Sequence, residues 1–194
     1  LDFGARPDTT ILSTKAIQEA VNTCSRDGGG RVIVPHGNYV TGTIVLKNNV
    51  EFHVENGATL YGSKNLNDYP DIKAEFISQK TRSVPKMRND PDASSAKTIK
   101  QLIYAENAHH IAITGMGDID GQGGVFDRKF FGGVGRPHLI RLISCKDVYV
   151  QNISLKNGGA WTQHYLNCER LQINGIKVFS NVNFNNDGLD LDCC

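Results

Sequence analysis

Apolar residues near the beginning of the chain recur at the spacing of a helix. The residues that form this stripe are Ile17, Ala20, Val21 and Cys24. Spacings of three and four residues place such side chains on one face of an α-helix. Ser13 or Thr14 can cap the first turn, and Gly28–Gly30 can end the helix because glycine accepts the left-handed conformation. The pattern therefore predicts an α-helix over 13–27.

After this helix the hydrophobic pattern changes to the two-residue period of β-strands. Val50, Phe52 and Val54 alternate with polar residues, and a turn at Asn56–Gly57 leads into another strand. The strands expected here cover residues 31–35, 39–40, 43–46, 50–54 and 58–62. The chain holds 20 glycines, which suits a fold with many turns.

The second half of the chain contains an internal repeat. The segment that begins at Cys145 matches the segment that begins at Cys168, with apolar residues at five equivalent positions. Weaker copies are marked by Ile111, Ile113 and Ile119 before these segments and by Leu189, Leu191 and Cys193 after them. Self-similarity with a period of roughly 20–25 residues is typical of a solenoid.

The content of the repeats indicates which solenoid to expect. The signature of leucine-rich repeats and the period of helical repeats are both absent, whereas short alternating strands separated by Asn and Gly fit a parallel β-helix. Cys145, Cys168 and Cys193 would then form one inward-facing ladder. We predict an all-β protein, a right-handed parallel β-helix whose N-terminal α-helix caps the open end of the coil.

We expect one β-helix domain over residues 1–194. Within it, 1–30 would be the opening segment and capping helix, 31–62 the first coils, 63–103 a long loop region and 104–194 the regular coils. From about Ser63 to Lys100 the alternation is lost, and a loop of this length is often functional, so it could form a wall of a binding cleft. The last residues lie inside an apparent strand, so we expect a C-terminally truncated chain.

Composition and charge exclude several classes of partner. The formal net charge is +1, which gives no general attraction to nucleic acid or membrane, and no apolar run is long enough to span a bilayer. Lys80, Arg82, Lys86 and Arg88 form a basic stretch, either a solvated face or a loop near an anionic substrate. The five cysteines include no C-x-x-C pair, so we expect buried free thiols, no metal site and no cofactor.

The segment Asn185–Asp190 has the residue types that glycoside hydrolysis needs. Hydrolysis with inversion uses one ionised carboxylate to activate water and one carboxylic acid to protonate the leaving oxygen, about 6.5–9.5 Å apart. Carboxylates one or two coils apart in a β-helix meet this spacing. Asp187 follows asparagines and precedes Gly188, which would clear space for a close approach. Taken alone, the same segment also fits an ordinary turn.

Several motifs in order along the chain resemble the family-28 glycoside hydrolases, the polygalacturonase family. The resemblance rests on Asp2–Ala5, Ala16–Gln18, Gly28–Gly30, Val32–Pro35, Gly117–Gly123, Arg136–Pro137, Trp161–His164 and Asn185–Gly188. The last segment matches the family motif Asn-Thr-Asp-Gly, with Asn186 in place of the threonine.

The resemblance implies a catalytic role for Asp187, as one of the carboxylates that activate water. The family's Asp-Asp pair, Gly-His-Gly and Arg-x-Lys motifs would lie beyond Cys194. We expect Asn185, Asp190, His164 and Trp161 to bind substrate. Alternative roles remain open: Asp190 could support the turn, while Trp161 and His164 could simply pack at a corner of the coil.

The resemblance also implies an activity. It indicates metal-independent, inverting hydrolysis of α-galacturonosyl linkages in pectin, with rhamnogalacturonan hydrolysis, a pectate lyase-like reaction or non-catalytic carbohydrate binding as alternatives. The partner would be a polysaccharide, the protein a monomer and its location secreted or periplasmic. The long loop favours action at a chain end. We expect the 194-residue chain by itself to be inactive, because the remaining catalytic residues would follow it.

Overall fold

The computed structural model describes residues 2–75, 100–126 and 135–194. One α-helix, α1 (Thr14–Arg26), precedes a series of short strands, and 3-10 helices cover Leu66–Asp68 and Gly123–Val125. The strands are β1 (Gly30–Val34), β2 (Gly37–Thr41), β3 (Ile44–Val45), β4 (Val50–Val54), β5 (Ala58–Gly62), β6 (Gln101–Glu106), β7 (His109–Thr114), β8 (Asp118–Asp120), β9 (His138–Ile143), β10 (Lys146–Gln151), β11 (Ser154–Lys156), β12 (Gln163–Leu166), β13 (Glu169–Asn174), β14 (Lys177–Phe179) and β15 (Asp190–Asp192).

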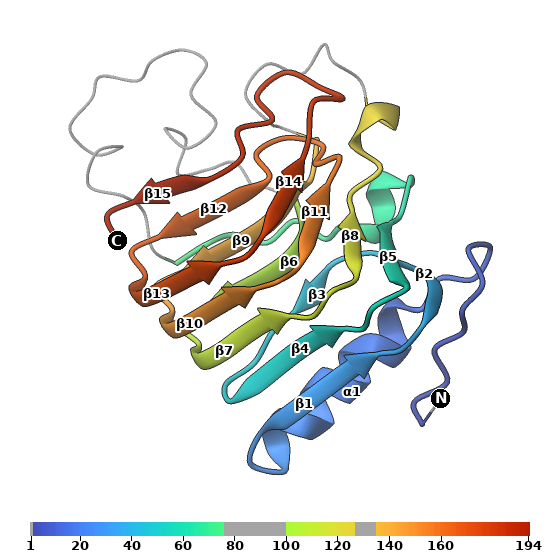
Figure 1. Ribbon diagram of the computed structural model, residues 1–194, viewed down its shortest axis with the longest axis horizontal. Coiled ribbons are helices and arrows are strands. Elements are labelled where there is room, and N and C mark those ends of the chain that lie inside the picture. Colours follow the sequence, from blue (N-terminus) through green and yellow to red (C-terminus); the bar gives the residue numbers. More distant parts are fainter. Residues whose placement is uncertain (1, 76–99, 127–134) are drawn as a thin grey trace.

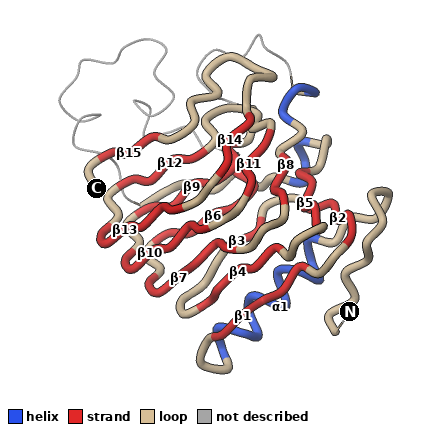
Figure 2. The backbone as a smooth tube through the Cα atoms, in the orientation of Figure 1, coloured by secondary structure: helices blue, strands red, loops and turns tan. Residues whose placement is uncertain are grey.

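The strands form three parallel sheets, and each coil of the chain adds one strand to each sheet (Figures 1 and 2). Sheet A has the order β14-β11-β8-β5-β2, sheet B has β1-β4-β7-β10-β13, and sheet C has β15-β12-β9-β6-β3. Equivalent residues of successive coils therefore lie in straight columns. The predicted parallel β-helix is confirmed.

The internal repeat corresponds to adjacent strands of sheet B. Val148 pairs with Leu171 and Val150 with Ile173, which is the alignment that the sequence predicts. The extension of the cysteine ladder to Cys193 is wrong. Leu166 pairs with both Ile143 and Asp192, so the residue in line with Cys145 and Cys168 is Cys194. The turn between β14 and β15 is longer than the equivalent turn between β11 and β12, and a fixed offset between repeats therefore misplaces the last residues.

The predicted helix is also confirmed, but its capping is not. Ile17 and Val21 are buried against the first coil, and Figure 1 shows α1 beside β1. Among the described residues, the Ser13 side chain makes no capping hydrogen bond to the helix. The Thr14 hydroxyl instead accepts a hydrogen bond from the Gly42 backbone N–H at 2.6 Å. The helix start is thus attached to the coil, which replaces local capping with a tertiary contact.

The core lies inside the coil, but the outer faces of the sheets differ. In β4 of sheet B every second residue is buried, as expected for a sheet with one wet face. In β9 of sheet C all six residues are buried. The outer face of sheet C carries a second apolar cluster, in which Tyr104, Ile143 and Leu166 pack against Val45, Ile72 and Ala74. Residues 69–75, after the first 3-10 helix, thus cover part of this face.

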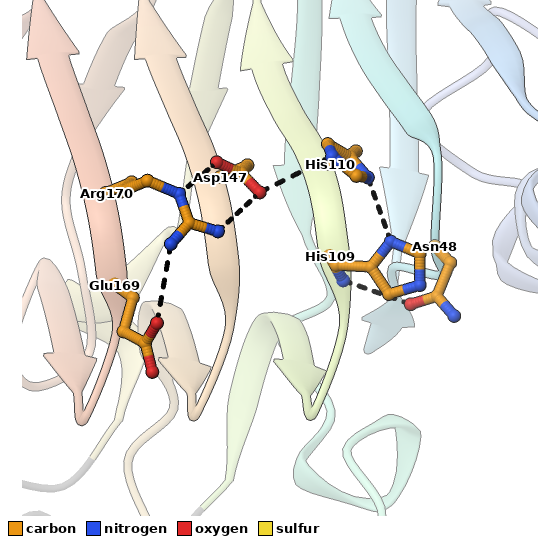
Figure 3. A network of polar contacts seen from close by, with 6 residues as sticks. All are labelled: Asn48, His109, His110, Asp147, Glu169 and Arg170. Atoms are coloured by element: carbon orange, nitrogen blue, oxygen red, sulfur yellow. Dashed lines mark hydrogen bonds and ion pairs between the residues drawn. The ribbon is translucent and has the colours of Figure 1, made fainter.

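A polar ladder marks the corner between sheets C and B (Figure 3). His110, Asp147 and Arg170 occupy equivalent positions and share the left-handed conformation, with φ of 51°, 53° and 53°. The Arg170 guanidinium donates two hydrogen bonds to the Asp147 carboxylate at 2.5 and 2.8 Å, and His110 lies 3.4 Å from the same carboxylate. The ladder is exposed, so its contribution to stability is small.

The expected loop region lies partly in the described ranges. Strand β6 begins at Gln101, within the segment 63–103. Residues 76–99, with the basic stretch Lys80–Arg88, lie outside the described residues. The division of 1–194 into a single domain stays a prediction.

Candidate active site

The candidate catalytic residue, Asp187, lies in the turn that leads into β15, the last strand of the chain. His164 pairs with Asp190, which places Trp161 opposite Asp187 three residues earlier. The Thr162 N–H donates to the Asp187 carbonyl at 2.8 Å, in agreement with this register. Gln101 pairs with His138, and His138 lies in line with Trp161. The four residues Gln101, His138, Trp161 and Asp187 therefore form one column along the sheet.

Asp187 is exposed. Asn185 is also exposed and has the left-handed conformation, with φ 55°. Gly188 has an ordinary backbone conformation, and a Cβ there would lie 3.7 Å from the nearest atom, a normal contact distance. The turn geometry therefore depends on Asn185 and its neighbours, and Gly188 is not required for a close approach in this structure.

The turn that carries Asp187 is tied to the preceding coil by two side chains. Arg136 donates hydrogen bonds to the carbonyls of Gly159 and Phe184, at 2.9 and 2.8 Å. The Asn186 amide donates to the carbonyls of Gly158 and Ala160, at 2.7 and 2.8 Å. The backbone immediately before Asp187 is thus bonded to residues 158–160 on the coil beneath it.

Trp161 is held between two imidazole rings. Its ring centroid lies 5.3 Å from that of His138 and 4.9 Å from that of His164, in an edge-on arrangement with His164. Trp161 keeps part of its surface exposed, whereas His138 is 2% exposed and His164 1% exposed. A sugar ring can therefore reach Trp161 in this structure but not His164. The buried ring of His164 contacts Trp161, and the substrate-binding role expected for His164 stays a prediction.

Both imidazoles lie in surroundings that disfavour their charged form. Burial, followed by the neighbouring Arg141, lowers the pKa of His164 to about 4. Burial is also the main reason that the pKa of His138 is lowered far below its usual range, with further contributions from Arg141, His164 and Arg136. Among the described residues neither Nδ1 atom has a hydrogen-bond partner. At neutral pH both rings are therefore uncharged, and the charge beside them is that of the neighbouring arginines.

Asp190 belongs to the outer face of sheet C. It continues a ladder that runs through Tyr104, Arg141 and His164, and it is half-buried. The structure thus places Asp187 and Trp161 in one column and His164 and Asp190 in another, three residues further along the same sheet. Asn185 lies in the turn that leads into them.

Three residues that contribute to this arrangement escaped the sequence prediction of the site. Arg136 and Asn186 belong to motifs that carry the family resemblance, but their bonds join residues more than 20 positions apart along the chain. His138 follows Arg136–Pro137 directly and is recognised only through its pairing with the Trp161 column. The sequence displays the motifs themselves, but it does not show which residues on other coils their side chains contact.

In residues 2–75, 100–126 and 135–194, His, Cys, Asp and Glu side chains do not gather in a group of three that could hold a metal ion. In the same ranges no helix has both the length and the apolar character needed to cross a membrane.

Comparisons with known proteins agree with the fold and the motifs. The profile of the family described as Glycosyl hydrolases family 28 matches residues 24–194. A grape (Vitis vinifera) protein named Probable polygalacturonase is 32% identical over 202 residues, which cover 100% of this chain and 39% of the relative. The Exo-poly-alpha-D-galacturonosidase of Dickeya chrysanthemi is 37% identical over 123 residues, which cover 62% of this chain and 19% of the relative.

A solved structure supports the same assignment. The hyperthermoactive Exopolygalacturonase from Thermotoga maritima superposes with a TM-score of 0.75 at 25% identity, over 97% of this chain and 47% of that chain. The handedness predicted for the β-helix is confirmed by this likeness. Because the family profile covers most of the chain and the grape relative matches all of it, this chain belongs to glycosyl hydrolases family 28.

Proposed function

We propose that the protein containing this chain hydrolyses α-galacturonosyl linkages in pectin, with inversion at the anomeric carbon and without a metal ion. The chain spans about two fifths of the length of its grape relative, so the activity is proposed for the whole polypeptide. The observation that carries the proposal is the exposed Asp187 of the motif Asn185–Gly188, in the turn that leads into a sheet C strand of a family-28 β-helix.

In this proposal Asp187 acts as a general base. Its ionised carboxylate accepts a proton from water, and that water attacks the anomeric carbon from the face opposite the leaving sugar. A carboxylic acid from a neighbouring coil protonates the leaving oxygen. Successive strands of a parallel sheet are about 4.8 Å apart, so carboxylates one or two coils away meet the roughly 6.5–9.5 Å that inversion requires.

The substrate would lie along the outer end of sheet C. Trp161 offers a partly exposed ring on which the apolar face of a sugar can stack, and the rings of His138 and His164 contact it. Asn185 and Asp190 provide polar groups for the sugar hydroxyls on either side of Asp187. Because both imidazoles are neutral, they themselves add no positive charge for the sugar carboxylates.

We further propose release of sugar units from a chain end, by a monomeric enzyme in a secreted or periplasmic location. The names of the Dickeya and Thermotoga relatives specify exo action, which supports this choice.

The test is hydrolysis of polygalacturonate by the full-length polypeptide. We expect reducing ends to form, and NMR of the early products to show the anomer opposite to that of the substrate linkage. Asp187→Asn should lower kcat by about 10²- to 10⁴-fold. The exposed Asp27→Asn, at the end of α1, is the matched control and should retain full activity.

Other products would contradict the proposal. Unsaturated sugars that absorb ultraviolet light, formed in a reaction that a chelator stops, would identify a lyase. Cleavage of rhamnogalacturonan but not of polygalacturonate would identify the other hydrolase. Unchanged activity of Asp187→Asn would remove the assigned base.

A further inference from the structure

The turns of the two coils beneath Asp187 lie close to each other. A Cβ at Gly123 would lie 2.1 Å from the Gly158 carbonyl oxygen, and one at Gly159 would lie 2.9 Å from the Pro137 carbonyl oxygen. Glycine at these positions is what permits the approach. The backbones are therefore near enough for side chains of one coil to bond directly to carbonyls of the next.

We propose that Arg136 and Asn186 are positioning residues, which hold Asp187 at the height and direction that its reaction requires. Neither side chain is proposed to touch the sugar. This inference rests on the proposed function of Asp187, since a general base acts only within hydrogen-bond reach of its water, and a misplacement of 1 Å can cost about 100-fold in rate.

Arg136 is an internal clamp between two coils. Its side chain is 0% exposed, and a single terminal nitrogen donates to Gly159 of one coil and to Phe184 of the next. The guanidinium carbon also lies 4.5 Å from the centroid of the Phe184 ring, which gives a cation–π contact. A buried charge is costly unless it is compensated; two carbonyls and a ring contact the guanidinium, while its Nε and Nη2 atoms have no hydrogen-bond partner among the described residues. The hydrogen bond to the Phe184 carbonyl and the contact with the Phe184 ring both end on the turn that leads to Asp187.

Asn186 is a second clamp, directly beside Asp187. Its amide nitrogen donates to both Gly158 and Ala160, while its amide oxygen accepts from the Asn183 N–H at 2.6 Å. A threonine, the residue of the family motif at this place, has one hydroxyl donor and could bond only one of the two carbonyls. The asparagine of this chain therefore holds the turn at one more point than threonine could.

Both clamps act on a backbone that is already bonded at Asp187 itself. The Thr162 N–H donates to the Asp187 carbonyl at 2.8 Å and reports on the position of that residue. If the clamps set this position, then removal of either should loosen the Thr162 hydrogen bond. A purely global contribution to stability would not single out that amide.

The experiment compares clamp variants with matched controls in the full-length polypeptide. The variants are Arg136→Met, Arg136→Lys and Asn186→Thr. The controls are Arg31→Met and Asn174→Thr, both on the exposed side of sheet B. For each we would measure kcat and KM on polygalacturonate, the Tm, and the hydrogen exchange rate of the Thr162 amide.

We expect Arg136→Met to lower kcat about 10- to 100-fold with KM changed less than about twofold. Arg136→Lys should recover part of this loss, because one ammonium can still bond a carbonyl but cannot stack on Phe184 as a planar guanidinium does. Asn186→Thr should lower kcat about three- to tenfold. The Thr162 amide should exchange faster in all three clamp variants and at the original rate in the controls.

The outcomes separate this inference from the proposed function. If the unsubstituted polypeptide does not hydrolyse polygalacturonate, the proposed function fails, and the Thr162 exchange rate alone decides whether the clamps hold the turn. Unchanged kcat in folded variants, or unchanged Thr162 exchange, would overturn the inference. A loss of kcat that is fully explained by the fraction of the variant that is unfolded would also overturn the inference. If Arg136→Met does not fold, Asn186→Thr carries the same test.

Discussion

Sheets B and C are built from the same coils and face the same core, yet their outer faces have opposite character. On sheet B, β10 alternates between buried and exposed positions, and ion pairs such as Arg31–Glu51 and Lys146–Glu169 join neighbouring strands. On sheet C, by contrast, three outward residues are all buried: Tyr104, Arg141 and His164. One face is solvated, and the other is covered.

The difference shows where a repetitive fold places its chemistry. A charge on sheet B is surrounded by water, which screens it. An ionisable group on sheet C has lost water, so its neighbours determine its charge state, as they do for His164 and His138. The candidate catalytic turn lies on the covered sheet. Ionisable groups with shifted pKa values are common at functional sites.

The largest expected effect compares one apolar residue on each outer face. Ile143, 0% exposed on sheet C, should cost about 2–5 kcal/mol of unfolding free energy when replaced by alanine, because it leaves a cavity in the outer cluster. Tyr149, 37% exposed on sheet B, should cost less than about 1 kcal/mol. Urea unfolding of Ile143→Ala and Tyr149→Ala measures both. Equal losses would contradict the difference between the two faces.

The next effect is a loss of stability in acid that comes from sheet C. The pKa of His164 is about 4 in the folded state, below its value of about 6.5 in an unfolded chain. The unfolded chain therefore binds the proton first as the pH falls. The resulting stability is fully present above pH 6.5 and is lost as the pH falls towards 4, by about 3 kcal/mol. His138, whose pKa is lowered for the same main reason, adds to the loss.

Urea midpoints at pH 7, 5.5 and 4.5 test this expectation. His164→Gln should flatten the decline, whereas His36→Gln, at an exposed turn, should leave it as it is. A decline of the same size in His164→Gln would show that the acid sensitivity arises elsewhere.

The smallest effect is expected on sheet B. Arg170→Met removes both hydrogen bonds to Asp147 in the ladder of Figure 3. Because the pair is exposed, the Tm should fall by no more than about 1–2 °C, and less at high salt. Thermal melts at low and high salt measure it. A drop as large as that of Ile143→Ala would mean that the exposed ladder, not the covered face, holds the coils together.

Local patterns were sufficient to predict the main elements. The stripe around Ile17 predicted α1, and the match between the segments at Cys145 and Cys168 predicted the register of β10 and β13. Both depend on periodicity within a segment, which the sequence displays directly. The expected position of Cys193 and the side-chain cap at Ser13 were wrong, because a longer turn and a tertiary contact from Thr14 override the local rule.

The candidate site was only partly accessible from the sequence. The motif around Asp187 and the segment Trp161–His164 were visible in the sequence, and the structure places them at the same end of sheet C. The burial of His164, the column that joins His138 to Trp161, and the clamps at Arg136 and Asn186 were not visible. Each of these features depends on how successive coils stack and on their register.

The sequence by itself therefore determined the repeating coil, its capping helix and the family to which the chain belongs, because hydrophobic period and ordered motifs are local properties. Tertiary structure alone decided which outer face is covered, which imidazoles are neutral and how the turn before Asp187 is held. Those properties arise from contacts between residues 20 or more positions apart, and their energies depend on the water that such contacts exclude.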